Sequence, residues 1–287
     1  MIKIHPSEYP YYKLDKLMLG GVTPRPIALA STIDADGNRN LSPFSCFNTF
    51  GVNPSTLVFS PSRRGTDNTT KHTFDNLKEI PEVVINTVTY SMVQQTSLSS
   101  TVYPKGVDEF VKAGFTPIES VSVRPFRVKE SPFQMECRVR DIIETSGQPG
   151  SANLVICEVV TLHIDENIMD ENGVIDPHKL DIVGRLGANN YVRASGEAVF
   201  QVEKPLTTMG IGVDELPESV RFSKVLTGND LGKLGNLEVL PDEELLKGLK
   251  LPAELKNASV EAIHHYAQKL IIQNRIEEAL LFLVAFG

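Results

Sequence analysis

Short apolar runs rich in β-branched residues recur from about residue 26 to residue 192, and turn residues separate them. Runs of this kind predict β-strands. No helical pattern follows each run, which argues against a doubly wound parallel sheet and favours a closed antiparallel barrel. The six expected strands cover residues 27–33, 40–50, 56–60, 82–88, 134–144 and 153–164, with the second as the hairpin partner of the first.

Helical patterns interrupt this β-rich region and dominate the chain beyond it. Residues 69–80 have helical spacing that ends at Pro81, and residues 92–99 are expected to form a short helix. Beyond about residue 195 the composition changes. The sequence therefore predicts a barrel domain over 1–195 and a C-terminal extension over 196–287 that packs on the barrel or on a dimer partner.

The extension starts with chain rich in Gly, Asn and Pro at 210–242, which is expected to be extended or loosely ordered. A short helix is predicted at 242–249 and a long one at 259–286, with Ser259 as its N-cap. Residues 279–286 are apolar on all sides, so the barrel or a second subunit is expected to cover them.

Composition and residue spacing exclude several functional classes. The formal net charge of -8 argues against nucleic acid as the main partner, because neutralising phosphates requires clustered Lys and Arg. Cys46, Cys137 and Cys157 are widely spaced, so neither a disulfide framework nor a zinc site is indicated. His264 and His265 are adjacent on a predicted helix, cannot share a metal at the i, i+4 spacing, and are expected to be solvated.

The apolar stretches are also informative about localisation. The most apolar stretch, at 279–286, is much shorter than the roughly 20 residues that span a bilayer. The first residues lack the apolar core of a signal peptide. A cytoplasmic protein without a membrane partner is predicted.

Signatures of self-sufficient catalysis are missing from the sequence. It contains no HExxH, GxSxG, SxxK or P-loop pattern, and no GxGxxG opens a helix after a strand. If the protein is an enzyme, a cofactor is expected to supply the reactivity, and no catalytic side chain or metal ligand is assigned.

Two neighbouring segments are candidates for holding such a cofactor. In the first, Pro43 cannot donate to a central ladder and marks a sheet edge or a split in the sheet. The free N–H groups of an edge suit a flat heterocycle. An ordinary barrel strand fits this segment equally well. The residues expected at the heterocycle are Ser45, Cys46, Phe47 and Asn48.

The second segment, residues 60–73, is basic and rich in hydroxyl groups in an otherwise acidic protein. Arg63 can donate two N–H groups to a phosphate, and Lys71 and Thr73 fall where a helix is expected to begin. A solvated basic loop is the alternative. A ligand that is flat at one end and phosphorylated at the other would suit both segments, and FMN and pyridoxal phosphate both have this form.

The ordered set of motifs resembles the flavin reductase-like family of FMN-binding split barrels. RPIALAST and NLSPFSCFN, at 25–32 and 40–48, are the longest of these motifs. Shorter ones follow in order at 62–64, 71–73, 82–86, 106–110, 130–132, 136–138 and 183–187, together with Tyr191. The likeness runs from about residue 20 to 195. His72 and Cys46 depart from the family pattern, in which many relatives have Asp and an aromatic residue there.

The resemblance implies a six-stranded antiparallel split β-barrel of Greek-key character and a homodimer with non-covalent FMN at the interface. It places residues 45–48 along the isoalloxazine ring and Asn86 near the ring's side. Phosphate contacts are implied for Ser60, Ser62, Arg63, Lys71 and Thr73, and contacts on the substrate side for Arg185, Gly187 and Tyr191.

The activity that the resemblance implies is transfer of hydride from NADH or NADPH to the flavin, and of electrons onward to an acceptor or a partner monooxygenase. An electron-transfer flavoprotein or ferric reductase on the same fold, with a protein or metal-complex partner, is an alternative. A non-enzymatic interaction protein that uses the C-terminal helix is a third possibility.

Overall fold

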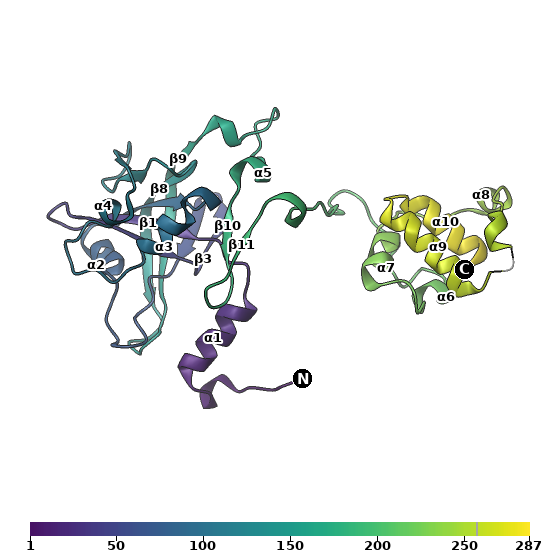
Figure 1. Cartoon of the computed structure of the whole chain (residues 1–287), viewed down its shortest axis with the longest axis horizontal. Coiled ribbons are helices and arrows are strands. Elements are labelled where there is room, and N and C mark those ends of the chain that lie inside the picture. Colours follow the sequence, from purple (N-terminus) through teal and green to yellow (C-terminus); the bar gives the residue numbers. More distant parts are fainter. Residues whose placement is uncertain (257) are drawn as a thin grey trace. The chain divides into compact units, whose positions relative to one another are not determined.

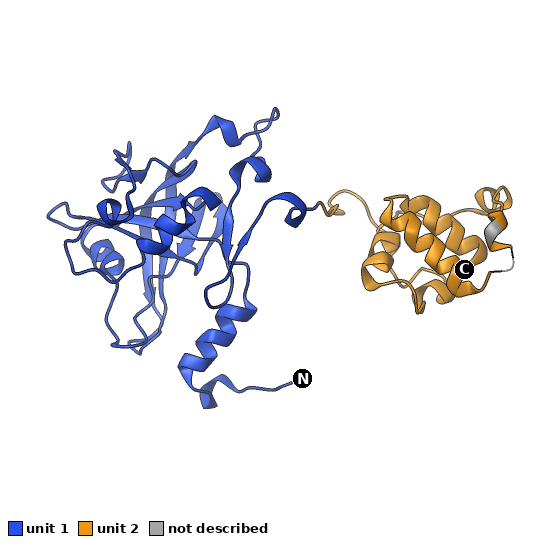
Figure 2. Cartoon of the chain, viewed as in Figure 1, with its two compact units in different colours: residues 1–200 blue, residues 201–287 orange. Residues whose placement is uncertain are grey.

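The computed structural model of the chain describes residues 1–256 and 258–287. The chain forms two compact units, Met1–Phe200 and Gln201–Gly287, which Figure 2 distinguishes by colour. Each unit has its own buried apolar core. The two units are therefore described separately.

Unit 1 is built around one seven-stranded antiparallel sheet, with the strand order β2-β1-β5-β8-β9-β4-β3 (Figure 1). The strands are β1 (Ala28–Ile33), β2 (Arg39–Phe44), β3 (Phe47–Val52), β4 (Ser55–Phe59), β5 (Glu82–Thr87), β8 (Phe133–Glu144) and β9 (Asn153–Ile164). β2 and β3 form the two edges of the sheet, yet only Ser45 and Cys46 separate them along the chain. This short connection brings the two edges together and closes the sheet into a barrel.

The predicted mainly β fold class is confirmed, but the prediction of one strand over 40–50 is wrong. The first half, β2, pairs with β1, whereas the second half, β3, pairs with β4. The chain changes partner at residues 45–48, which we call the corner segment. Pro43 has no N–H to donate, and it lies just before this change.

The alternating side chains of β1 explain why this strand is buried on both faces. Ala28 and Ala30 belong to a core inside the barrel, where the Phe44 and Phe59 rings also meet at a centroid distance of 5.6 Å. Leu29 points the other way, into a second core beneath the short helices. Helices therefore cover the outer face of this part of the sheet.

Those helices and small strands complete unit 1. α2 packs on β1, and α3 and α4 pack on β2. The helices are η1 (Pro6–Glu8), α1 (Tyr11–Gly21), α2 (His72–Glu79), η2 (Tyr90–Met92), α3 (Val93–Leu98), α4 (Glu109–Ala113), η3 (Glu166–Ile168), α5 (Pro177–Leu180) and η4 (Gly196–Ala198). The short strands are β6 (Pro117–Ile118), β7 (Arg127–Val128), β10 (Val183–Arg185) and β11 (Tyr191–Arg193).

The helix expected from residue 69 begins at His72. Two features of the preceding chain oppose an earlier start. Asn68 has a left-handed φ of 57°, and the Asp67 carboxylate accepts hydrogen bonds from the N–H and hydroxyl groups of Thr69. Residues 64–70 therefore form a loop before α2.

Unit 2 is helical, with α6 (Glu218–Arg221), α7 (Gly228–Gly235), α8 (Glu243–Lys247), η5 (Ala253–Leu255), α9 (Val260–Ile272) and α10 (Ile276–Phe286). The expectation of loosely ordered chain over 210–242 is wrong, because α6 and α7 lie within it. Thr227 and Asp230 form a capping box that starts α7. Buried Val220 and Leu234 anchor the two helices in the unit's core.

The helix predicted over 259–286 is two helices, α9 and α10. Ser259 caps the first as predicted, with its hydroxyl accepting from the N–H of Ala262 at 3.3 Å. Asn274, with φ of 61°, then ends the helix in the left-handed conformation that Asn tolerates. The two helices pack against each other, and the apolar residues Leu280 and Leu283 of α10 lie in the core of unit 2.

The prediction that His264 is solvated is also wrong. Its side chain is buried on α9, and Nδ1 lies 2.7 Å from the Ser223 hydroxyl. The neighbouring His265 is exposed. In the described part of the chain, no helix has the length and apolar character needed to cross a bilayer.

A buried carboxylate on β8 holds the loop before β7 against the sheet. Glu136 is fully buried and accepts hydrogen bonds from the N–H groups of Val121 (2.9 Å) and Ser122 (2.6 Å). His163 Nε2 lies 2.7 Å from the same carboxylate. Burial alone would raise the pKa of Glu136, but these hydrogen bonds hold its pKa below the ordinary value.

We predict that Glu136→Gln lowers the free energy of unfolding of unit 1 by about 1–3 kcal/mol, because the amide NH2 replaces one carboxylate oxygen and leaves one loop N–H facing a buried donor instead of an acceptor. The control is Glu144→Gln on the same strand, whose exposed pair with Lys78 contributes about 1 kcal/mol or less. Urea unfolding followed by tyrosine fluorescence measures both.

The contribution of Glu136 is present above its unfolded pKa of about 4.3, and it is lost as the pH falls through the lower folded pKa. Equal stability changes in the two variants at neutral pH would contradict this account.

Candidate functional site

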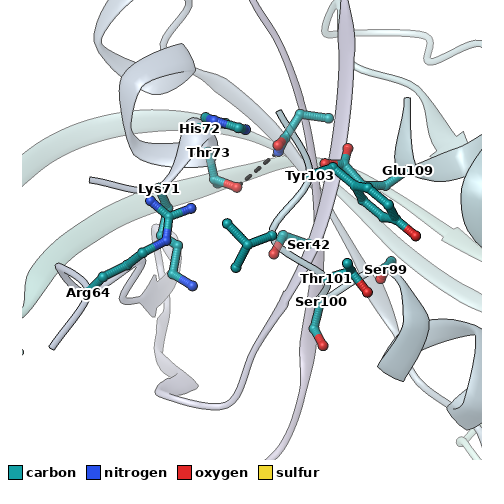
Figure 3. A pocket seen from close by; sticks show the side chains of 12 residues that line it. Ser42, Arg64, Lys71, His72, Thr73, Ser99, Ser100, Thr101, Tyr103 and Glu109 are labelled. Carbon is teal, nitrogen blue, oxygen red and sulfur yellow. Dashed lines mark hydrogen bonds between the residues drawn. The ribbon is translucent and has the colours of Figure 1, made fainter. Parts of the chain in front are cut away.

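The candidate site is a pocket in unit 1, between β2, the start of α2 and the loop that follows α3 (Figure 3). We call it the cationic pocket. Its lining residues are Asn40, Ser42, Arg64, Lys71, His72, Thr73, Ser99, Ser100, Thr101, Val102, Tyr103 and Glu109. Polar groups therefore form most of its wall.

Arg64, Lys71 and His72 bring three basic side chains to one side of the pocket. Burial lowers the pKa of Lys71 and the pKa of His72, and the Arg64 charge lowers both further. In the described residues, no carboxylate oxygen lies within 4 Å of Lys71 Nζ. The lowered pKa values show that the Arg64 charge disfavours the protonated forms of Lys71 and His72. A bound anion would offset this repulsion.

The donor set suits a phosphate. Arg64 Nε is buried without a hydrogen-bond partner in the described structure, while Nη1 is held by Thr69 Oγ1 at 2.8 Å. Lys71 is the N-cap residue of α2, and the N–H groups at a helix start favour anions. The buried Thr73 hydroxyl accepts from Asn40 Nδ2 at 2.9 Å, the contact drawn in Figure 3.

The opposite wall of the pocket carries hydroxyl groups and one acid. Ser99, Ser100 and Thr101 line it. The sequence prediction did not include these residues, although three consecutive hydroxyl side chains are visible in the sequence. Glu109 is buried, burial raises its pKa, and its Oε2 accepts from the N–H of Leu41 at 3.1 Å. This wall can hydrogen-bond to the neutral parts of a ligand.

The sequence assigned Arg63 to a phosphate, whereas the arginine that lines the cationic pocket is Arg64. The Arg63 guanidinium binds Asn68 within its own loop, with Nε 2.9 Å from Oδ1, and it does not line the pocket. Sequence spacing could not separate two adjacent arginines, because the turn of residues 64–70 decides which of them faces the pocket.

The corner segment lies next to the basic loop. The Cys46 carbonyl accepts from the N–H of Ser60 at 2.9 Å, and Phe47 pairs with Phe59. Ser42 lines the cationic pocket, and Ser45 follows three residues later, just after β2 ends, a distance of roughly 10 Å for extended chain. The structure thus brings the two predicted segments together.

Several predicted residues have other partners. Ser60 Oγ accepts from the N–H of Asn153 at 3.1 Å and lies 3.0 Å from the Ser62 hydroxyl. Asn86 is fully buried, donating to the Leu29 carbonyl at 3.0 Å and accepting from the N–H of Val128 at 2.9 Å. The side chains of Ser60, Ser62 and Asn86 do not line the cationic pocket.

The residues expected on the substrate side occupy the hairpin of β10 and β11. The Arg185 guanidinium lies 4.6 Å from the centre of the Tyr191 ring. At Gly187 an added Cβ would lie 3.1 Å from the Gly20 Cα, so the hairpin turn passes close to the end of α1. Arg25 links this turn to the corner segment, because its guanidinium bonds both Leu186 O and Ser45 Oγ.

Comparison with known proteins agrees with this fold. A family model described as "Flavin reductase like domain" matches residues 19–180, more than half of the chain. An uncharacterized protein of Aquifex aeolicus is 36% identical over 189 residues, which cover 66% of this chain and 94% of the relative.

Two solved structures are also similar. Nitrilotriacetate monooxygenase component B from Bacillus cereus is 30% identical, with a TM-score of 0.65 over 70% of this chain and 98% of that one. The 2-nitrobenzoate 2-nitroreductase of Pseudomonas fluorescens is 26% identical, with a TM-score of 0.62 over 73% and 100% of the two chains. The family resemblance predicted from the ordered motifs is confirmed, and the chain belongs to the flavin reductase-like family.

Proposed function

We propose that this protein binds FMN without a covalent bond in unit 1 and acts as an oxidoreductase that takes electrons from NADH or NADPH. The observation that carries the proposal is that the cationic pocket lies beside the corner segment, and that its basic residues follow this segment closely along the chain. The pocket suits the phosphate, and the corner segment offers backbone to a flat ring.

In this proposal each part of the site has a physical role. Arg64, Lys71 and His72 neutralise the phosphate, and the N–H groups at the start of α2 complete its hydrogen bonds. Backbone groups of the corner segment orient the ring. The bound flavin supplies the redox chemistry by accepting a hydride and passing electrons onward. The protein's contribution is positioning and electrostatics.

A homodimer with FMN at the interface is part of the proposal. α1 has no buried residue in the single chain, although it carries Tyr11, Tyr12, Leu17 and Met18, each about half exposed. An apolar helix surface of this kind is typical of a subunit interface. The match to a monooxygenase component B supports a partner monooxygenase as one electron acceptor.

The proposal predicts that FMN added to the purified protein gives a bound-flavin spectrum, and that NADH or NADPH bleaches it rapidly without oxygen. An absorbance spectrum before and after each addition measures this. A protein that leaves the FMN spectrum unchanged would contradict flavin binding. Bleaching by a reduced protein partner alone, and by neither nucleotide, would favour an electron-transfer flavoprotein instead.

We predict that Arg64→Ala weakens FMN binding by about 10- to 100-fold, because a charge-assisted hydrogen bond contributes about 1.5–3 kcal/mol. Arg64→Ala with Lys71→Ala should weaken it further, whereas Arg63→Ala is the matched control and should have the smaller effect. Titration of flavin fluorescence gives the affinities. Riboflavin, which lacks the phosphate, should bind all variants alike; an equal loss for riboflavin would contradict a phosphate site.

His72 should make FMN binding depend on pH. Burial and the nearby charges of Arg64, Lys105 and Lys71 lower the pKa of His72 in the free protein, and only Asp75 opposes them. A bound phosphate raises this pKa, so binding takes up a proton and weakens as the pH rises through the His72 pKa of the complex. A pKa change of one unit corresponds to about a tenfold change in affinity.

The measurement is the FMN dissociation constant between about pH 6 and pH 8, the range in which histidine titrates, for the wild-type protein and His72→Asn. The ratio of the two affinities should fall towards one at the higher pH. The ratio cancels the titration of the phosphate itself, and a ratio that does not change with pH would contradict the role of His72.

A further inference from the structure

Arg25 lies just before β1 with its guanidinium buried. The residue is only 7% exposed. Nε donates to Ser45 Oγ at 3.3 Å, and Nη2 donates to the Leu186 carbonyl at 3.1 Å. Nη1 donates to the carbonyls of Val22, at 2.7 Å, and of Leu19. One side chain thus joins the end of α1, the β10–β11 hairpin and the corner segment.

All four of these acceptors are neutral. Within residues 1–256 and 258–287, no Asp or Glu oxygen lies within 4 Å of the Arg25 guanidinium. Buried charges in proteins are normally paired, because removing an ion from water costs several kcal/mol. Neutral carbonyls satisfy the hydrogen bonds but leave the positive charge uncompensated. If Arg25 only acted as a structural clamp, joining these three parts of the chain by hydrogen bonds, its side chain would not need to carry a buried positive charge.

The Arg25 charge acts electrostatically on Cys46 of the corner segment. Desolvation raises the pKa of the Cys46 thiol, Arg25 opposes this shift by favouring the thiolate, and the Asp15 charge raises the pKa by less than Arg25 lowers it. An anion beside residues 45–48 would therefore be stabilised by the same charge. Arg25 also pairs through its backbone with Arg185, with N–H to O distances of 3.0 and 2.8 Å, which fixes the hairpin relative to the corner.

We propose that Arg25 is a positioning residue for the flavin and that its uncompensated positive charge favours the reduced form. The inference rests on the proposed function. A hydride brings two electrons and one proton to a neutral ring, so the reduced ring carries one negative charge. A fixed cation behind the corner segment binds that anion more tightly than the neutral oxidised ring, and it raises the midpoint potential of the bound flavin.

The test compares the midpoint potential of FMN bound to the wild-type protein, Arg25→Gln and Arg25→Lys. Loss of the charge in Arg25→Gln should reduce the preference for reduced over oxidised flavin about tenfold, which corresponds to about 30 mV for a two-electron couple. Arg25→Lys keeps the charge but loses the planar fork, so its potential should stay close to that of the wild-type protein.

A second pair of variants leaves the anchors of α1 intact and covers the case in which Arg25→Gln does not fold. Ser45→Asp places a carboxylate beside the Arg25 guanidinium and cancels its charge, while Ser45→Asn is the neutral control of similar size. The potential should fall in Ser45→Asp by about as much as in Arg25→Gln, and much less in Ser45→Asn.

The outcomes separate this inference from the function on which it rests. Equal shifts in Arg25→Gln and Arg25→Lys would reduce Arg25 to a structural clamp, and an unchanged potential in Arg25→Gln or in Ser45→Asp would overturn the electrostatic role. In either case FMN still binds to the wild-type protein. A wild-type protein that does not bind FMN would overturn the proposed function and this inference together.

Discussion

The change of strand partner at the corner segment is the constraint on which the site depends. Because the chain passes from β2 to β3 through two residues, the two edges of one sheet must meet there. The Cys46 carbonyl accepts from the N–H of Ser60, which brings the loop before α2 to the same place. Closing the barrel therefore also assembles the candidate site, and a change that opened the barrel would separate the corner segment from the loop before α2.

Electrostatics sets the candidate site apart in an otherwise acidic chain. The protein has a net charge of -8, yet several basic residues lie together at the candidate site. Partial burial there strengthens the interaction of each charge with its neighbours. The Arg64 charge disfavours the charged forms of Lys71 and His72, and Arg25 is buried without a carboxylate within 4 Å among the described residues. Such an arrangement is unfavourable by itself, and it would be stabilised by a ligand whose phosphate is always negative and whose ring becomes negative on reduction.

The sequence predicted the strands well, because β-branched runs such as those of β5 and β9 report burial directly. For residues 40–50 it left a sheet edge and a split at Pro43 as alternatives, since side-chain alternation does not reveal which strand accepts the hydrogen bonds. The same limit applies to the site: Lys71 and Thr73, which spacing put at a helix start, line the pocket, but spacing does not show that Arg64 lines it and Arg63 does not, because the left-handed turn at Asn68 decides this. Long-range contacts such as the one between Ser223 and His264 have no local signal.

The candidate site belongs to unit 1. The residues that line the cationic pocket, and the residues bonded to Arg25, belong to unit 1. The family model ends at residue 180, before unit 2 begins. Unit 2 covers the apolar face of α10 with its own helices and therefore has a core that does not depend on the barrel's. The chemistry proposed for unit 1 arises from its own residues, so the extension requires a separate explanation from the one that accounts for flavin binding.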